Sequence, residues 1–123
     1  MQLTEDQNDS QYQIQAYEPG TITINQQHYK KSLILTPQVL ISDWAPQSLS
    51  ELTDQHLEQI LALKPDLILL GTGETFKMPP TRLLAPLYQA GYGAECMDTC
   101  AACRSFIALS SEGRKVAAAL LIK

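Results

Sequence analysis

The 123-residue sequence lacks the features that mark most common protein classes. No run approaches the ~20 consecutive apolar residues of a transmembrane helix, so no membrane span is expected. The 9 basic residues are outnumbered by 13 acidic ones and form no stripe with interleaved aromatics, which argues against nucleic acid as a partner. The first residues contain neither a basic segment followed by an apolar core nor arginine, so a cytoplasmic location is expected.

Cysteine and histidine are scarce as well. The three cysteines are an odd number and are expected to be reduced thiols. Cys96, Cys100 and Cys103 share the C-x3-C-x2-C spacing of radical S-adenosylmethionine enzymes, but the chain is too short for the barrel of such enzymes. Cys100 falls at a predicted helix start, where a thiolate is stabilised. His28 and His56 are isolated, so no metal or cofactor is expected, catalytic residues stay unknown, and the roles of Cys100 and Cys103 stay open.

The composition is that of one globular domain. Apolar residues make up 45 % of the chain, enough for a normal core, and the length fits a domain of roughly 100–150 residues. Residues 1–10 contain Glu5, Asp6 and Asp9 and no base. We therefore expect a disordered acidic tail over residues 1–10 and a single α/β domain over residues 11–123.

The first half of the chain has a strand pattern. Residues 11–18 alternate, with Tyr12, Ile14 and Ala16 on one face, and a Pro-Gly turn leads into a β-branched segment over residues 21–24. The pair predicts an antiparallel β-hairpin. Further short strands are expected over residues 32–36 and 39–41, and Trp44 is expected to plug the core over the sheet.

The second half alternates between helix and strand. Helices are expected after Thr53, after Thr81 and from Asp98 or Thr99 to Gly113, the second of them short or kinked by Pro86. Strands are expected at residues 67–70, 93–97 and 116–122. This alternation indicates a parallel or mixed sheet that carries helices.

A glycine-rich loop follows the strand at residues 67–70. Gly71, Thr72, Gly73 and Glu74 continue from an apolar run that is typical of a central strand. Ligands bind at the carboxyl ends of such strands, and exposed amide groups there can hold an anion. The loop has neither the dinucleotide fingerprint nor a Walker sequence, so a purely conformational role for its glycines is an equal alternative.

A second group lies at the start of the last helix. Asp98 or Thr99 caps this helix, and Arg104 follows one or two turns on. A cation near the positive end of a helix calls for a compensating carboxylate or a bound anion, so a structural ion pair of Arg104 is the alternative to a ligand. Parallel strands would bring both loops to one edge. The candidate ligand-binding residues are therefore Gly71, Thr72, Gly73, Glu74, Asp98, Thr99 and Arg104.

Several segments together resemble a known family. These are SLILTP, LILLGTGETFKMPP, GYGAECMDTCAACRSF and SSEGRKVAAALL, and the resemblance extends over residues 11–123. The family consists of small domains of unknown function, first seen structurally in a methanogen protein. It includes the mitochondrial NADH dehydrogenase (complex I) alpha subcomplex assembly factor 3 and an adipogenesis-associated protein, and this chain is most similar to the uncharacterised proteobacterial branch.

The resemblance implies a fold but no chemistry. It implies a three-layer α/β domain with a mixed central β-sheet flanked by helices, to which the N-terminal antiparallel β-hairpin adds a layer. Shared positions would be Gly71, Thr72, Gly73, Asp98 and Arg104, whereas family members often carry glycine in place of Cys100. No enzymatic activity is established for the family, and its mitochondrial branch acts through contacts between proteins.

Two functions remain open on the sequence. The first is a non-catalytic binding or assembly module that presents a surface to another protein, with a homo-oligomer as a compatible arrangement. The second is an enzyme or small-anion-binding protein that uses the crevice between the GTGE loop and the helix start at Asp98 to Arg104. A redox or metal protein based on the cysteines ranks third.

Overall fold

The computed structural model describes residues 10–123, so the predicted acidic tail over residues 1–10 lies outside the described residues except for Ser10. Its strands and helices are, in chain order, β1 (Ile14–Glu18), β2 (Thr21–Ile24), β3 (Gln27–Tyr29), β4 (Leu33–Leu35), β5 (Leu40–Ile41), η1 (Leu49–Glu51), α2 (Asp54–Leu61), β6 (Leu67–Gly71), η2 (Thr81–Leu84), α3 (Ala85–Gln89), β7 (Ala94–Met97), α4 (Thr99–Ser111) and β8 (Val116–Leu120).

The strands form two sheets. The larger sheet has the order β5-β4-β8-β6-β7, in which β6 pairs in parallel with β7 and β8, whereas β4 pairs antiparallel with β5 and β8. The smaller sheet is antiparallel, with the order β1-β2-β3. The predicted mixed central sheet and the predicted hairpin are therefore confirmed.

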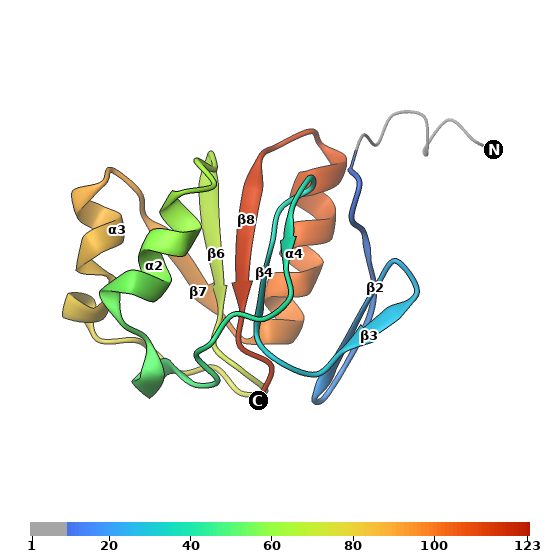
Figure 1. The fold of residues 1–123 in the computed structure, drawn as a ribbon, viewed down its shortest axis with the longest axis horizontal. Helices are drawn as coiled ribbons and strands as arrows, with labels where there is room; N and C mark the ends of the chain where they lie inside the picture. Colours follow the sequence, from blue (N-terminus) through green and yellow to red (C-terminus); the bar gives the residue numbers. More distant parts are fainter. Residues whose placement is uncertain (1–9) are drawn as a thin grey trace.

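The domain is built in three layers (Figure 1). Helices α2 and α3 cover one face of the five-stranded sheet, and α4 covers the other face together with the β1–β3 sheet. Each face has its own buried core: Leu69 and Phe106 belong to the core on the α4 side, and Ile60 and Trp44 to the core on the α2 side. The fully buried Trp44 confirms its prediction as a core plug.

Strand β8 is the centre of this arrangement. Val116, Ala118 and Leu120 face the core on the α4 side, whereas Ala117 and Ala119 face the core on the α2 side. All five are buried, as expected for a strand covered on both faces. The alanine side chains are short, so both faces of the strand leave room for larger side chains from the helices.

The small sheet differs from its prediction in two ways. The pattern missed β3, a short and mostly exposed third strand with no apolar alternation of its own. It also placed Ala16 on the buried face with Ile14, but Ala16 is exposed. The reason is an irregular register between Ile14 and Ala16, which inserts Gln15 as an extra residue and turns Tyr17 toward the interior instead.

The predicted interruption of the second helix is confirmed. Residues Thr81–Leu84 form a 3₁₀ turn, and the α-helical part begins only at Ala85, directly before Pro86. Proline has no N–H and tolerates the first helical turn, so the α-helix starts where Pro86 can occupy that turn.

Neighbouring residues on α4 provide a test of the core on this face. Phe106 is 1 % exposed and Ile107 is 46 % exposed. We expect Phe106→Ala to lower the free energy of unfolding by about 3–5 kcal/mol, because it removes a buried aromatic ring and leaves a cavity. Ile107→Ala, the matched control, should change it by less than about 0.5 kcal/mol. Urea denaturation measures both, and similar losses would contradict the assignment of the buried face.

Candidate functional site

The structure brings the two predicted loops together at the carboxyl edge of the sheet. In the parallel β6–β7 pair, Gly71 is in register with Met97, so the loop after β6 and the start of α4 emerge side by side. Two backbone hydrogen bonds join them. The Thr72 amide donates to the Met97 carbonyl at 2.8 Å, and the Thr99 amide donates to the Gly73 carbonyl at 2.9 Å.

The Thr99 hydroxyl connects the segments that meet at this edge. It is fully buried, accepts a hydrogen bond from the Gly73 amide at 2.9 Å and donates one to the Leu121 carbonyl. One side chain thereby links the loop after β6, the first turn of α4 and the segment after β8. The Leu121 amide closes the same junction by donating to the Gly71 carbonyl at 3.0 Å.

The two loop glycines are required by close packing. A Cβ on Gly71 would lie 2.8 Å from the Thr99 Oγ1 atom and 3.1 Å from Leu120 Cδ2. A Cβ on Gly73 would lie 2.2 Å from the backbone oxygen of Lys123, and Gly73 has φ +119°, which side chains rarely adopt. The glycines at both positions are therefore explained by the shape of the chain alone, because a side chain would collide with neighbouring atoms.

Most amide groups at the start of α4 are already engaged. Asp98 is the N-cap, and its side chain accepts from the Ala101 amide at 2.8 Å, while its carbonyl accepts from the Ala102 amide at 3.0 Å. The Thr99 amide is bonded to the loop. The Cys100 amide is the one in this first turn that has no hydrogen-bond partner among residues 10–123. An anion at this helix end would therefore depend on side chains.

Glu74 and Arg104 lie at the surface of the same region. Both are exposed, and within residues 10–123 Arg104 makes no ion pair with a carboxylate. Arg104 lines a small pocket of about 230 Å³ against β1 together with Tyr17, Cys100, Cys103 and Ile107. Thr72 is buried and holds the loop: its hydroxyl accepts from the Lys77 amide at 3.0 Å. The assignment of a ligand to this edge stays a prediction.

Tyr17 joins this region from the other end of the chain. Its hydroxyl oxygen is buried and has no hydrogen-bond partner within residues 10–123. Burial, followed by the negative charge of Glu74 and by the nearby thiols, raises the pKa of Tyr17. Sequence reasoning missed this residue, because only the extra residue in β1 and the packing of the small sheet on α4 bring it there.

The three cysteines lie on two sides of the sheet. Cys96 packs against the core on the α2 side, whereas Cys103 belongs to the core on the α4 side and lines the small pocket with Cys100. Burial raises the pKa of Cys96, and burial with the nearby Cys100 raises the pKa of Cys103 to about 12. No group of three metal-ligating side chains occurs in the part of the chain that the structure describes.

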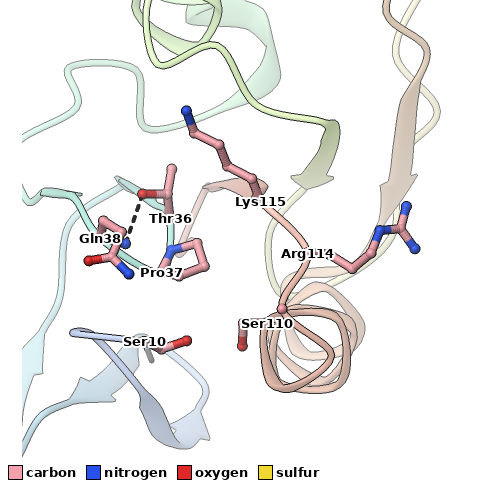
Figure 2. A pocket seen from close by; sticks show the side chains of 8 residues that line it. Ser10, Thr36, Pro37, Gln38, Ser110, Arg114 and Lys115 are labelled. Carbon is pink, nitrogen blue, oxygen red and sulfur yellow. Dashed lines mark hydrogen bonds between the residues drawn. The ribbon is translucent and has the colours of Figure 1, made fainter. Parts of the chain in front are cut away.

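A second pocket opens at the opposite end of the strands. Its volume is about 300 Å³, and Figure 2 shows the side chains that line it, from Ser10, the turn at Thr36 and Gln38, and the end of α4. Arg114 points away from the turn, and Ser110 donates to the Ile107 carbonyl at 3.3 Å. The Thr36 hydroxyl accepts from the backbone amide of Gln38, and the exposed cations Arg114 and Lys115 complete the lining.

Solved structures share this fold. A Bordetella parapertussis protein is 33 % identical, with a TM-score of 0.84, over 91 % of this chain and 96 % of its own. A Xanthomonas campestris protein is 39 % identical, with a TM-score of 0.82, over 94 % of this chain and 87 % of its own. A Bordetella pertussis protein described as a Mth938-like domain is 28 % identical, with a TM-score of 0.77, over 90 % of this chain and 85 % of its own.

Two curated relatives are similar in sequence. The "13 kDa major membrane protein" of Francisella tularensis subsp. holarctica is 30 % identical over 98 % of this chain and 99 % of its own length. The rat "NADH dehydrogenase [ubiquinone] 1 alpha subcomplex assembly factor 3" is 29 % identical over 88 % of this chain, and the match covers 59 % of that protein. Within residues 10–123, none of the helices is long and apolar enough to cross a membrane.

The fold defines a class of small α/β domains in which helices cover both faces of a mixed sheet. The chain belongs to the family described as "Protein of unknown function (DUF498/DUF598)", whose model matches residues 14–121. The family resemblance inferred from the sequence, including the relation to assembly factor 3, is confirmed.

The close approach at Gly73 can be tested directly. We expect Gly73→Ala to lower the free energy of unfolding by more than about 2 kcal/mol, because strained φ values alone cost of order 1–3 kcal/mol. Gly93→Ala is the control, since a Cβ there meets nothing within 4 Å. Chemical denaturation of both variants measures the difference. Equal stabilities would show that the segment at Lys123 does not press on Gly73.

The buried thiol predicts a dependence of stability on pH. Burial raises the pKa of Cys103 to about 12 in the folded state, against 9.0 for an unperturbed thiol. This contribution to stability is therefore complete below pH 9 and is lost as the pH rises through that interval. Between pH 8 and pH 11 the wild type should lose more free energy of unfolding than Cys103→Ala does. Parallel losses in the two proteins would contradict the burial of this thiol.

Proposed function

We propose that this domain is a non-catalytic binding module that acts by contact with another protein. The observation that carries the proposal is a pair of exposed apolar side chains in the loop that follows β6. Phe76 is 48 % exposed and Met78 is 74 % exposed, whereas the other exposed large apolar side chains, Val39, Tyr88 and Ile107, are each single residues on separate segments. Large apolar side chains on a shared exposed segment are typical of contact surfaces.

The loop carries these side chains on a fixed base. The buried Thr72 hydroxyl bonds the Thr75 carbonyl at 3.3 Å and the Lys77 amide at 3.0 Å, so the chain folds back on itself before Phe76 and after it. Pro79 is buried at the far end of the segment. A fixed loop reduces the ordering cost of binding, which favours a role in recognition.

A groove adjoins this loop. It has a volume of about 730 Å³ and is lined by Ser48, Leu49, Ser50, Asp54, Lys77, Met78, Pro80, Arg82 and Leu83. Its wall combines apolar groups with two cations and a single carboxylate. A partner segment with an apolar residue flanked by acidic ones would be complementary to this surface. The name of the assembly factor relatives also supports a protein partner, although the domain corresponds to 59 % of the rat protein.

The second candidate is a small-anion-binding protein or enzyme at the GTGE loop and the start of α4. The observation that favours it is that the exposed Arg104 and the unpartnered Tyr17 hydroxyl lie at one pocket. The negative charges of Glu74 and Asp98 near Tyr17 oppose an anion there, so it ranks below the binding module. A cytoplasmic location and a homo-oligomer stay predictions for either candidate.

Site-specific photo-crosslinking in cells of the source organism tests the binding surface. A benzophenone side chain at position 76 should give one discrete crosslinked species. The same group at position 88 should give none, because Tyr88 has the same exposure of 48 % but lies on α3. In addition, Phe76→Ser with Met78→Ser should weaken capture of that species about tenfold or more, as expected for central contact residues.

The control for this experiment is the unfolding midpoint, which the double variant should leave unchanged because both side chains are exposed. Crosslinking of the same species from both positions, or capture that survives the double variant, would contradict the proposed surface. Phosphate or sulfate binding that is lost in Arg104→Ala would instead favour the second candidate.

A further inference from the structure

Cys100 and Cys103 form a C-x-x-C pair in the first two turns of α4. Residues three apart on a helix lie on one face, and both thiols line the same pocket of about 230 Å³. They differ in their surroundings. Cys103 is 2 % exposed and belongs to the core with Phe106, whereas Cys100 is half-buried at the rim.

We propose that Cys100 and Cys103 are a thiol–disulfide exchange site, in which Cys100 attacks a substrate disulfide and Cys103 resolves the intermediate. The division of roles follows from access. The half-buried Cys100 opens to the pocket beside Arg104. The buried Cys103 is reached only by a group already bound at Cys100.

The exchange is balanced in atoms and electrons. The Cys100 thiolate attacks one sulfur of a disulfide R–S–S–R, forms a Cys100–S–S–R mixed disulfide and releases one thiolate, which takes up a proton from solvent. The Cys103 thiol then attacks the Cys100 sulfur and passes its proton to the departing thiolate, which leaves as the second R–SH. The pair is oxidised by two electrons, and the substrate disulfide is reduced to two thiols.

The helix can accommodate the product bond. Side chains three apart on a helix have Cβ atoms about 5–6 Å apart, and a disulfide needs roughly 3.5–4.5 Å. Closing this difference requires a small movement of the first turn. Thr99 and Ala101 are held by hydrogen bonds on either side, but the Cys100 amide has no partner among residues 10–123, so its own backbone N–H does not oppose the movement. Cys103 keeps its buried position meanwhile.

The opening of the pocket indicates the class of substrate. Arg104 is exposed there without an ion pair to a carboxylate of residues 10–123, and Gln15, Ala16 and Tyr17 of β1 form the opposite wall. A small peptide-like disulfide with carboxylate groups would place its sulfur at Cys100 and a carboxylate at the exposed Arg104. The negative charges of Glu74 and Asp98 near Tyr17 weaken this attraction, so the contribution of Arg104 is modest. Neither Phe76 nor Met78 lines this pocket, so the inference goes beyond the proposed function and does not depend on it.

The primary experiment uses the full-length reduced protein and glutathione disulfide. After reaction, remaining thiols are blocked with one isotopic form of iodoacetamide, and oxidised thiols are then reduced and labelled with a second form. Trypsin cleaves after Arg82 and Arg104, so one peptide over residues 83–104 holds all three cysteines. We expect the second label on Cys100 and Cys103 together, and the first label on Cys96.

Variants separate the two steps. Cys103→Ala should accumulate a mixed disulfide between Cys100 and glutathione, at least about tenfold above the wild type, because the resolving thiol acts at an effective concentration in the mM range or above. Cys100→Ala should leave Cys103 in its reduced form. Cys96→Ala is the matched control and should react as the wild type does, because Cys96 lies on the other side of the sheet.

Three results would overturn the proposal. These are a wild-type protein that stops at the mixed disulfide while Cys103 stays reduced, oxidation of Cys96 at the same rate as Cys100, and a reaction no faster than that of the urea-unfolded chain. The labelling pattern of the wild type decides the question even if Cys103→Ala does not fold. The Phe76 and Met78 double variant should keep the exchange reaction, so its failure is distinct from failure of the binding surface.

The role of Arg104 has its own comparison. Arg104→Gln should slow the reaction with glutathione disulfide about two- to fivefold, the size of an exposed ion pair, and leave the reaction with the cationic disulfide cystamine unslowed. Equal effects on both disulfides would overturn the assignment of Arg104 to carboxylate recognition.

Discussion

The buried hydroxyl of Thr99 is the constraint on which the edge of this domain depends. It bonds the Gly73 amide and the Leu121 carbonyl, and so joins three chain segments that are distant in sequence. An unpaired buried polar group costs about 1–3 kcal/mol, so neither the loop nor the segment after β8 can move away without leaving an unsatisfied partner. The position of α4 on the sheet follows from this junction, and with it the pocket that α4 shares with β1.

The same junction determines which groups at this edge are used for packing and which stay accessible to a ligand. Gly71 and Gly73 have no side chains because Thr99 and Lys123 occupy the space, and the amides of Gly73, Thr99 and Ala101 bond within the protein. Two groups of side chains remain accessible near it. The loop after β6 presents Phe76 and Met78, and the start of α4 presents Cys100 and Arg104 at a pocket. The domain thus combines a rigid edge with two surfaces whose residues can be substituted independently of each other.

Local patterns predicted the elements with strong signals and missed what depends on tertiary packing. The apolar run of β6 and the capping residue Asp98 placed the loop and α4 correctly, because strand length and N-cap chemistry are properties of short segments. Strand β3 was missed because it is held by its neighbour β2 and not by its own sequence. Tyr17 was also missed, since one extra residue in β1 reverses the faces of the strand beyond it. No sequence pattern predicts that residue 17 lies near residue 100, so only the structure could reveal this part of the candidate site.

The central position of β8 has a consequence for synthesis in the cell. This strand pairs with β4 on one side and β6 on the other, and it is the last strand of the sheet to be made. Until its residues have left the ribosome, the β5–β4 and β6–β7 pairs have no strand to join them, and the edges of β4 and β6 that pair with β8 lack their partner. Open strand edges invite pairing with other chains. Folding of this domain is therefore completed after translation of β8 rather than progressively, and the nascent chain is most exposed to aggregation just before that strand emerges.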